Sequence, residues 1–219
     1  MTTEEVFTEQ AQEWAKLMAS SEELHPDLLP YVEESEFGKM LRHPLHYEVP
    51  WIFSNAMANR RYEEKLKMVQ KAIDSQNWKQ YVWLHERPYR VDAFKEIQEL
   101  LEDSEYWHLL GQIWTDTENG WANLEDWKKL FSSRRPKRSY LMDWDEQMAL
   151  DSLADRVTIY RGCQKGLNEN GISWTLKRDK AEWFATRFGK DGKVLEMRIN
   201  KSRILAVFTG RNEFEVVIV

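Results

Sequence analysis

Hydrophobic side chains recur three or four residues apart through most of the first 150 residues, which is the spacing of an α-helical face. Tyr62, Leu66, Val69 and Ile73 share one such face and predict a helix from about 59 to 73. The same spacing predicts further helices near 75–86, 91–102, 104–115, 122–132 and 143–153. This part of the chain is therefore expected to be mainly helical.

The first fifty residues combine one helix signal with a long interruption. Thr2 and Glu5 have the spacing of a capping box, and Trp14 and Leu17 follow at helical spacing. Residues 21–50 contain four prolines, which lack the backbone N–H that helices and central strands use. This segment is predicted to be irregular.

From Val157 the hydrophobic period shortens, and β-branched residues predict a strand that ends at Arg161 and Gly162. Further strands are predicted at 172–176, 194–199, 204–208 and 214–219, and a helix at 177–188. Helices followed by strands indicate an α+β fold rather than a parallel α/β sheet. We expect a helical region over residues 1–150 and a separate β-rich domain over 151–219.

Composition adds bounds on function. With 42% hydrophobic and 13% aromatic residues the chain can build a core, and many of its eleven tryptophans lie at core spacing, which predicts a packing role for most of them. A net charge of −6 disfavours a nucleic-acid partner bound through its phosphates. The basic run 134–138 is the exception: it is interpreted as a solvated loop, with docking of an acidic partner or an RNA as the alternative.

The single cysteine, Cys163, cannot form an intrachain disulfide, which suits a reducing compartment. It is interpreted as a small half-buried residue at a strand end rather than a nucleophile. His43 and His46 flank a proline without an acidic or cysteine partner in register, so no metal is expected. No secretory leader and no membrane span are predicted, and the expected location is the cytoplasm.

Three short segments carry the strongest functional signal. They are Tyr160-Arg161-Gly162, Ser173-Trp174-Thr175 and Glu213-Phe214-Glu215, in this order. An arginine, a serine strand and a Glu-x-Glu strand resemble the Arg-Ser-Glu clade of ADP-ribosyltransferases. The resemblance covers roughly residues 155–219, and it implies a small split-sheet catalytic domain that uses NAD as its substrate.

Cleavage of the bond between nicotinamide and ribose produces an oxocarbenium-like sugar, which a nearby carboxylate stabilises. In a strand, Glu213 and Glu215 are expected on one face, with Phe214 directed into the core. The resemblance implies that Glu215 is the catalytic carboxylate and that Glu213 orients or deprotonates the acceptor. A glutamate at that position implies an arginine acceptor.

The resemblance also implies an NAD-binding set around the first two segments. Arg161 would hold the phosphates or the adenine ribose, and Gly162 would offer its backbone to the nicotinamide carboxamide. Ser173 would hold Glu215 in place. The family pattern Ser-Thr-Ser is here Ser-Trp-Thr, so Thr175 keeps a hydroxyl on the same strand face while Trp174 points away.

Three further positions match the family less closely. Asn170 is expected to contact NAD, Phe184 to stack against nicotinamide and Arg187 to grip the diphosphate. Phe184 has an alternative interpretation as a core residue of the helix 177–188, beside Ala181 and Ala185.

The expected function is transfer of ADP-ribose from NAD to an arginine of a protein, as in phage or bacterial effectors, with the target unidentified. One alternative is an NAD glycohydrolase in which water is the acceptor. Another is a non-catalytic module in which the helical region binds a partner and the transferase fold is a scaffold.

Overall fold

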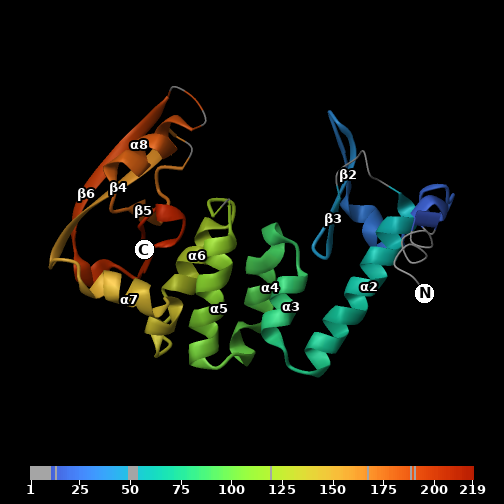
Figure 1. Cartoon of the computed structure of the whole chain (residues 1–219), viewed down its shortest axis with the longest axis horizontal. Helices are drawn as coiled ribbons and strands as arrows, with labels where there is room; N and C mark the ends of the chain where they lie inside the picture. The colour runs from blue at the N-terminus through green and yellow to red at the C-terminus, as the bar shows by residue number, and fades with distance from the viewer. Residues whose placement is uncertain are drawn as a thin grey trace. The chain divides into compact units, whose positions relative to one another are not determined.

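The computed structural model describes residues 11–12, 14–48, 54–118, 120–166, 168–187, 189 and 191–219 (Figure 1). The chain divides into two compact units, Met1–Ala93 and Phe94–Val219. The predicted capping box at Thr2 and Glu5 lies outside the described residues, whereas Trp14 and Leu17 have the expected helical backbone.

The N-terminal unit contains a small antiparallel sheet that the sequence did not predict. The 3₁₀-helix η1 (Pro26–Tyr31) leads into β1 (Val32–Ser35), β2 (Gly38–His43) and β3 (His46–Glu48), paired in the order β1-β2-β3. The expectation of an irregular segment was wrong because the prolines at 26, 30 and 44 lie in η1 and in the turn between β2 and β3. Proline there costs the sheet no ladder hydrogen bond.

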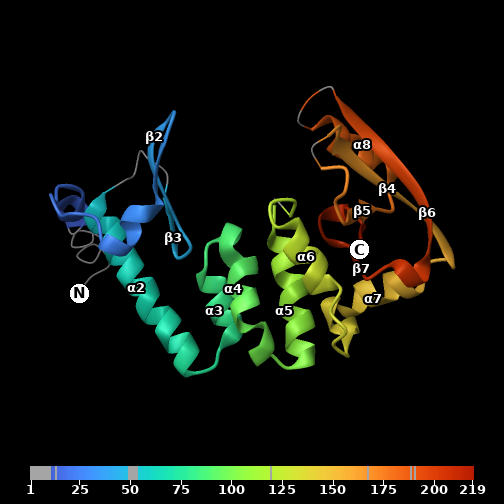
Figure 2. The same cartoon turned by 180° about the vertical axis from the view of Figure 1, so that it is seen from behind.

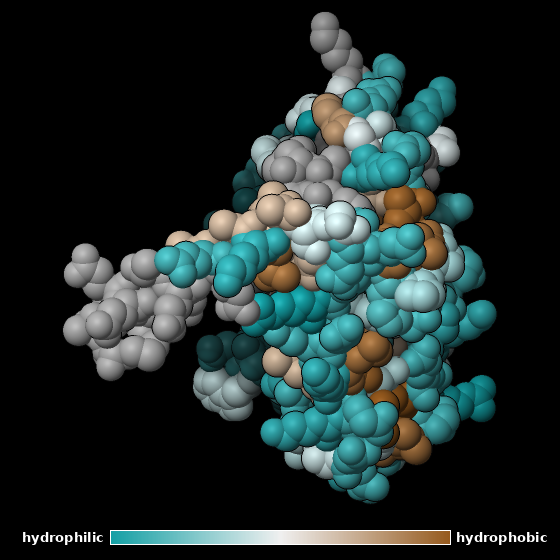
Figure 3. Space-filling view, turned by 90° about the vertical axis from the view of Figure 1, so that its right-hand side faces the viewer, coloured by the Kyte–Doolittle hydropathy of each residue, from teal (hydrophilic) through white to brown (hydrophobic). Residues whose placement is uncertain are grey.

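Two helices complete this unit, α2 (Asn55–Asp74) and α3 (Trp78–Leu84), followed by the 3₁₀-helix η3 (Arg87–Tyr89). The first half of α2 packs on the sheet, where Tyr62 joins a core with Leu28, Leu41, Leu45 and Ala58. Of the predicted face of α2, Tyr62 is buried and Val69 is partly covered, but Leu66 and Ile73 are exposed. Figure 3 views the molecule from the right-hand side of Figure 1 and shows hydrophobic side chains scattered among hydrophilic ones.

The second unit begins with helices close to their predicted positions. They are α4 (Arg90–Ile97), whose first residues precede the division, η4 (Gln98–Leu100), α5 (Asp103–Asp116), α6 (Leu124–Phe131), η5 (Arg138–Leu141) and α7 (Trp144–Asp151). Capping boxes begin α5 and α7. Phe94, Trp107 and Trp127 are fully buried, whereas Met148 in α7 is exposed.

Among the described residues a five-stranded antiparallel sheet follows, in the order β6-β4-β5-β8-β7 (Figures 1 and 2). Its strands are β4 (Arg156–Gln164), β5 (Ser173–Thr175), β6 (Gly192–Asn200), β7 (Ala206–Phe208) and β8 (Glu215–Val217). Helix α8 (Arg178–Thr186) packs on β4 and β6, and the 3₁₀-helices η6 (Lys201–Arg203) and η7 (Gly210–Asn212) precede β7 and β8. Helices and antiparallel sheets together make the fold α+β.

The division between the two units differs from the predicted boundary near residue 150. Helix α7 and the residues before it contact the sheet region: the Sδ atom of Met142 accepts from Val207 N at 3.2 Å, and Glu146 Oε1 accepts from Thr209 N at 3.2 Å. Periodicity marks where the chain changes from helix to strand. It does not show that residues 94–150 pack on the later strands.

Candidate functional site

Glu215 lies at the start of β8, an interior strand next to the edge strand β7. It is paired with Thr175 on β5 and with Phe208 on β7, and its side chain is half-buried. Its Oε1 atom accepts a hydrogen bond from the indole Nε1 of Trp114 in α5, at 3.1 Å. A residue of the helical segment therefore fixes the carboxylate that the sequence singles out.

Trp114 is itself held in an aromatic cage. Its ring centroid lies 5.0 Å from that of Trp127 and 5.1 Å from that of Phe131, both in edge-to-face geometry. Trp114 is only 7% exposed. Because such packing restricts the ring, the direction of its N–H toward Glu215 is fixed before any ligand binds.

The two glutamates are not related by strand alternation, and that prediction was wrong. Glu213 caps η7 with helical backbone angles, φ −90° and ψ −23°, and Phe214 has φ +46°. The chain thus turns immediately before β8, and only Glu215 belongs to the strand. Phe214 is half-buried rather than in the core, with the Nζ of Lys177 4.0 Å from its ring centroid.

A left-handed backbone at a bulky residue is strained, by about 1–3 kcal/mol, and persists only where neighbours impose it. The end of β5 supplies these neighbours. Thr175 Oγ1 donates to the carbonyl of Glu213 at 2.6 Å, and Leu176 N donates to the carbonyl of Phe214 at 3.1 Å. The turn that carries both glutamates is therefore clamped to β5.

The register of β5 corrects the expected role of Ser173. Thr175 is the residue opposite Glu215, whereas Ser173 is opposite Val217. The backbone carbonyl of Ser173 accepts from Nη1 of Arg161. Thr175 is buried and Trp174 faces the other side of the sheet, as alternation predicted.

Arg161 braces the connection between β4 and β5. Its Nε and Nη2 atoms donate to the carbonyl of Asn168, at 3.3 and 2.8 Å, and Nη1 donates to Ser173. Burial lowers the pKa of Arg161, while the charges of Cys163 and Glu215 act to raise it. Alternation along β4 places this side chain on the sheet face opposite that of Thr175 and Glu215.

Gly162 is required by helix packing. A Cβ atom there would overlap the carbonyl oxygen of Ala181 and lie 2.6 Å from the backbone N of Ala185, both in α8. The close approach expected at this glycine is therefore occupied by α8 rather than open to a nicotinamide carboxamide. Ala181 and Ala185 are buried against β4, as predicted.

Phe184 and Arg187 lie at the C-terminal end of α8. The Phe184 ring is half-buried and 4.9 Å from Trp183, which agrees with the packing alternative. Arg187 is exposed, with its guanidinium 5.1 Å from the Trp183 ring centroid. Neither residue is among the described residues that line a cavity beside the connection from β4 to β5.

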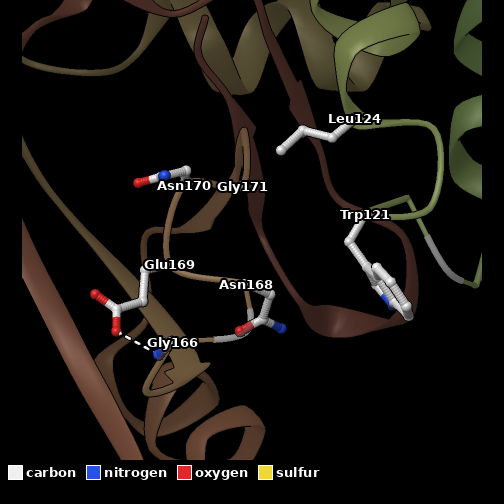
Figure 4. Close-up of a pocket in the computed structure, with 7 residues that line it drawn as sticks. All are labelled: Trp121, Leu124, Gly166, Asn168, Glu169, Asn170 and Gly171. Carbon is white, nitrogen blue, oxygen red and sulfur yellow. Dashed lines mark hydrogen bonds between the residues drawn. The ribbon is translucent and has the colours of Figure 1, made fainter.

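That cavity has a volume of about 380 Å³. It lies between the start of α6 and the connection from β4 to β5, and its described lining is Trp121, Leu124, Gly166, Asn168, Glu169, Asn170 and Gly171 (Figure 4). Of the predicted NAD-binding residues, Asn170 is the one in this lining.

Two other sequence interpretations concern groups outside this site. Cys163 is buried and burial raises its pKa, which keeps the thiol protonated and unsuited to nucleophilic attack. Within the basic run, Arg135 donates to the carbonyls of Gln98 and Leu101 and stacks over Tyr106. This arginine is therefore part of the fold, and the remaining basic side chains described there are exposed.

Across the described ranges there is no cluster of three or more histidine, cysteine or acidic side chains that could hold a metal ion. His46 instead bonds Glu48 at 2.9 Å. The helices of the described part include none with the length and apolar character needed to cross a membrane.

Comparison with protein-family models, with curated proteins and with solved structures found no match to this chain.

Sequence reasoning missed Trp114 and Trp121. Trp114 lies in the predicted helix 104–115 and is buried in the core. The available signal was chemical: a buried indole N–H usually finds an acceptor. Neither spacing nor composition could show that the acceptor is Glu215.

Proposed function

We propose that the protein transfers ADP-ribose from NAD to an arginine of another protein, through a site centred on Glu215. The observation that carries the proposal is the hydrogen bond from Trp114 to a half-buried Glu215, at the end of a strained turn that also bears Glu213. Residues with strained backbone cluster at functional sites. The antiparallel sheet with Arg161, Ser173 and Glu215 on β4, β5 and β8 supports a split-sheet transferase fold.

The chemistry assigned to the site follows from charge. As nicotinamide leaves, positive charge develops on the ribose. The Glu215 carboxylate stabilises this charge through its own negative charge and its contact with the ribose 2′-hydroxyl. The indole N–H keeps one carboxylate oxygen in place, so little reorganisation accompanies the step. Glu213 orients the guanidinium acceptor and takes up its proton, since an arginine side chain is a poor nucleophile while protonated.

An NAD glycohydrolase is the second candidate, because the same carboxylate would serve with water as nucleophile. The two are separated by incubating the protein with labelled NAD, with and without a bacterial lysate. A transferase labels a protein band and releases nicotinamide faster when lysate is present. Release at one rate in both conditions, with no labelled protein, contradicts the transferase assignment and supports the glycohydrolase.

A non-catalytic partner-binding module is the alternative from a different class. It predicts no turnover of NAD with or without lysate. A role in a phage or bacterial cytoplasm forms part of the transferase proposal, and the lysate experiment also identifies its target.

A further inference from the structure

We propose that the cavity beside Trp121 binds the adenine ring of NAD, an inference that rests on the proposed function for its choice of ligand. The volume of about 380 Å³ lies within the range of about 300–1,000 Å³ typical of small-molecule sites. The cavity combines one exposed aromatic side chain, one aliphatic side chain and carboxamides (Figure 4). These are the groups that hold a planar heteroaromatic ring.

One wall is fixed by Arg161. Its guanidinium holds the carbonyl of Asn168 through two N–H groups, and it lies directly against Gly171, where a Cβ atom would overlap it. The guanidinium of Arg161 therefore fixes the backbone of the loop that lines the cavity. In this arrangement Arg161 prepares the site without touching the ring.

The other wall is built on Trp114. A Cβ atom at Gly120 would lie 3.3 Å from Cζ3 of Trp114, so this wall packs closely on the side chain that holds Glu215. Trp121 follows directly and is 54% exposed. An exposed indole beside a cavity is a stacking platform, because every base has a π face to offer it.

The polar groups favour a neutral ring over a phosphate. Asn168 Oδ1 accepts from Gln164 N at 3.0 Å, which leaves its amide nitrogen directed to the side of Trp121 (Figure 4). Glu169 accepts from Gly166 N at 2.7 Å and from Lys193 Nζ at 2.6 Å, and the bond from Lys193 lowers its pKa. The described lining thus contains a carboxylate and no basic side chain, which disfavours phosphate.

NAD has two rings, and the position of Glu215 decides between them. The nicotinamide end must reach Glu215, which is not among the described residues that line the cavity. Adenine is the neutral ring at the other end, and carboxamides pair with its donor and acceptor edge. Asn168 supplies such a group on the side of Trp121, so the cavity fits adenine.

The experiment measures binding of AMP and of nicotinamide mononucleotide by calorimetry. Trp121→Ala should weaken AMP binding about tenfold, which is the loss expected for one base–aromatic stack. The binding of nicotinamide mononucleotide should stay unchanged in this variant. Trp183→Ala is the matched control, since Trp183 is 53% exposed and does not line the cavity, and it should bind AMP normally. Asn168→Asp retains the acceptor for Gln164 and removes the donor, so it should also weaken AMP.

No binding of AMP, equal binding by Trp121→Ala and wild type, or a loss confined to nicotinamide mononucleotide would overturn the inference. The test is independent of turnover. If AMP binding depends on Trp121 but the protein does not consume NAD, the adenine site is supported and the proposed enzymatic function is refuted. If NAD turnover depends on Glu215 but Trp121→Ala leaves the KM for NAD unchanged, the enzymatic function is supported and the adenine site is refuted.

Discussion

Glu215 is held by a side chain that lies 101 residues earlier in the chain. The family resemblance assigns this anchoring to Ser173, but the register gives the nearest β5 position to Thr175, and the indole of Trp114 donates the bond. Hydrogen bonds to charged groups are worth about 1.5–3 kcal/mol. Trp114 is therefore expected to act as a positioning residue.

Trp114→Phe should lower kcat for nicotinamide release by about tenfold or more with little change in KM for NAD. Phenylalanine keeps an aromatic ring beside Trp127 and Phe131 and removes only the indole N–H, so the carboxylate loses its fixed direction. Steady-state kinetics at several NAD concentrations measure both constants.

Trp127→Phe is the matched control. It makes the same change in the same aromatic cage, and within the described residues the Trp127 N–H has no hydrogen-bond partner. Its kcat should stay close to wild type. If the two variants lose kcat equally, the cage acts through packing alone and the hydrogen bond to Glu215 has no catalytic role.

The residues of the candidate site were predictable by type and order, but their contacts were not. Strand alternation placed Ser173, Thr175 and Trp174 correctly relative to one another, because alternation is a local property of the backbone. It failed for Glu213, since the left-handed angle at Phe214 is imposed by Thr175 and Leu176, which lie nearly forty residues earlier.

Among the elements, α8 and β4 show why one glycine of the motif is needed. The two pack so closely at Gly162 that a single methyl group would displace the helix. The sequence predicted both elements and the apolar side of α8, with Ala181 and Ala185 facing the sheet. It could not show that the helix occupies the space beside Gly162.

Gly162→Ala should destabilise the protein by about 1–3 kcal/mol, the range for overpacking a tight contact. The added Cβ meets backbone atoms of α8 at Ala181 and Ala185, which cannot rotate away. Chemical denaturation measures the change.

Gly210→Ala is the corresponding control, because a Cβ there meets nothing within 4 Å. It should leave the free energy of unfolding within about 0.5 kcal/mol of wild type. Equal stability of the two variants would show that α8 does not press on β4 as described.

At the level of the two units, sequence periodicity found the helices and the later strands, while the compact units divide after Ala93 rather than near residue 150. Periodicity also missed the sheet β1-β2-β3, whose strands are three to six residues long and whose second turn contains Pro44. Such short strands give little alternation to detect. Their stability comes from packing on η1 and α2, which is a property of the folded unit.

A buried histidine makes the N-terminal unit sensitive to acid. Burial lowers the pKa of His43 from its ordinary value of 6.5, with a further lowering by His46, and its Nδ1 accepts from Leu45 N at 3.0 Å. The unfolded chain therefore binds a proton at this residue more readily than the folded one. The free energy of unfolding should decrease as the pH falls below 6.5.

Denaturation between pH 8 and 5.5 tests this prediction in wild type and His43→Asn. Asparagine can accept from Leu45 N–H and does not titrate, so the variant should lose less stability over this range. An equal loss in both proteins would assign the acid sensitivity to other groups.

The central claim concerns the carboxylate at the start of β8, and Glu215→Gln addresses it most directly. The amide keeps the size of the side chain and an oxygen to accept the Trp114 N–H, but it removes the negative charge. The measurement is nicotinamide release from NAD in the presence of lysate, after denaturation curves confirm equal folding. We expect a loss on the order of a hundredfold or more in the variant. Equal release by Glu215→Gln and wild type would contradict the account.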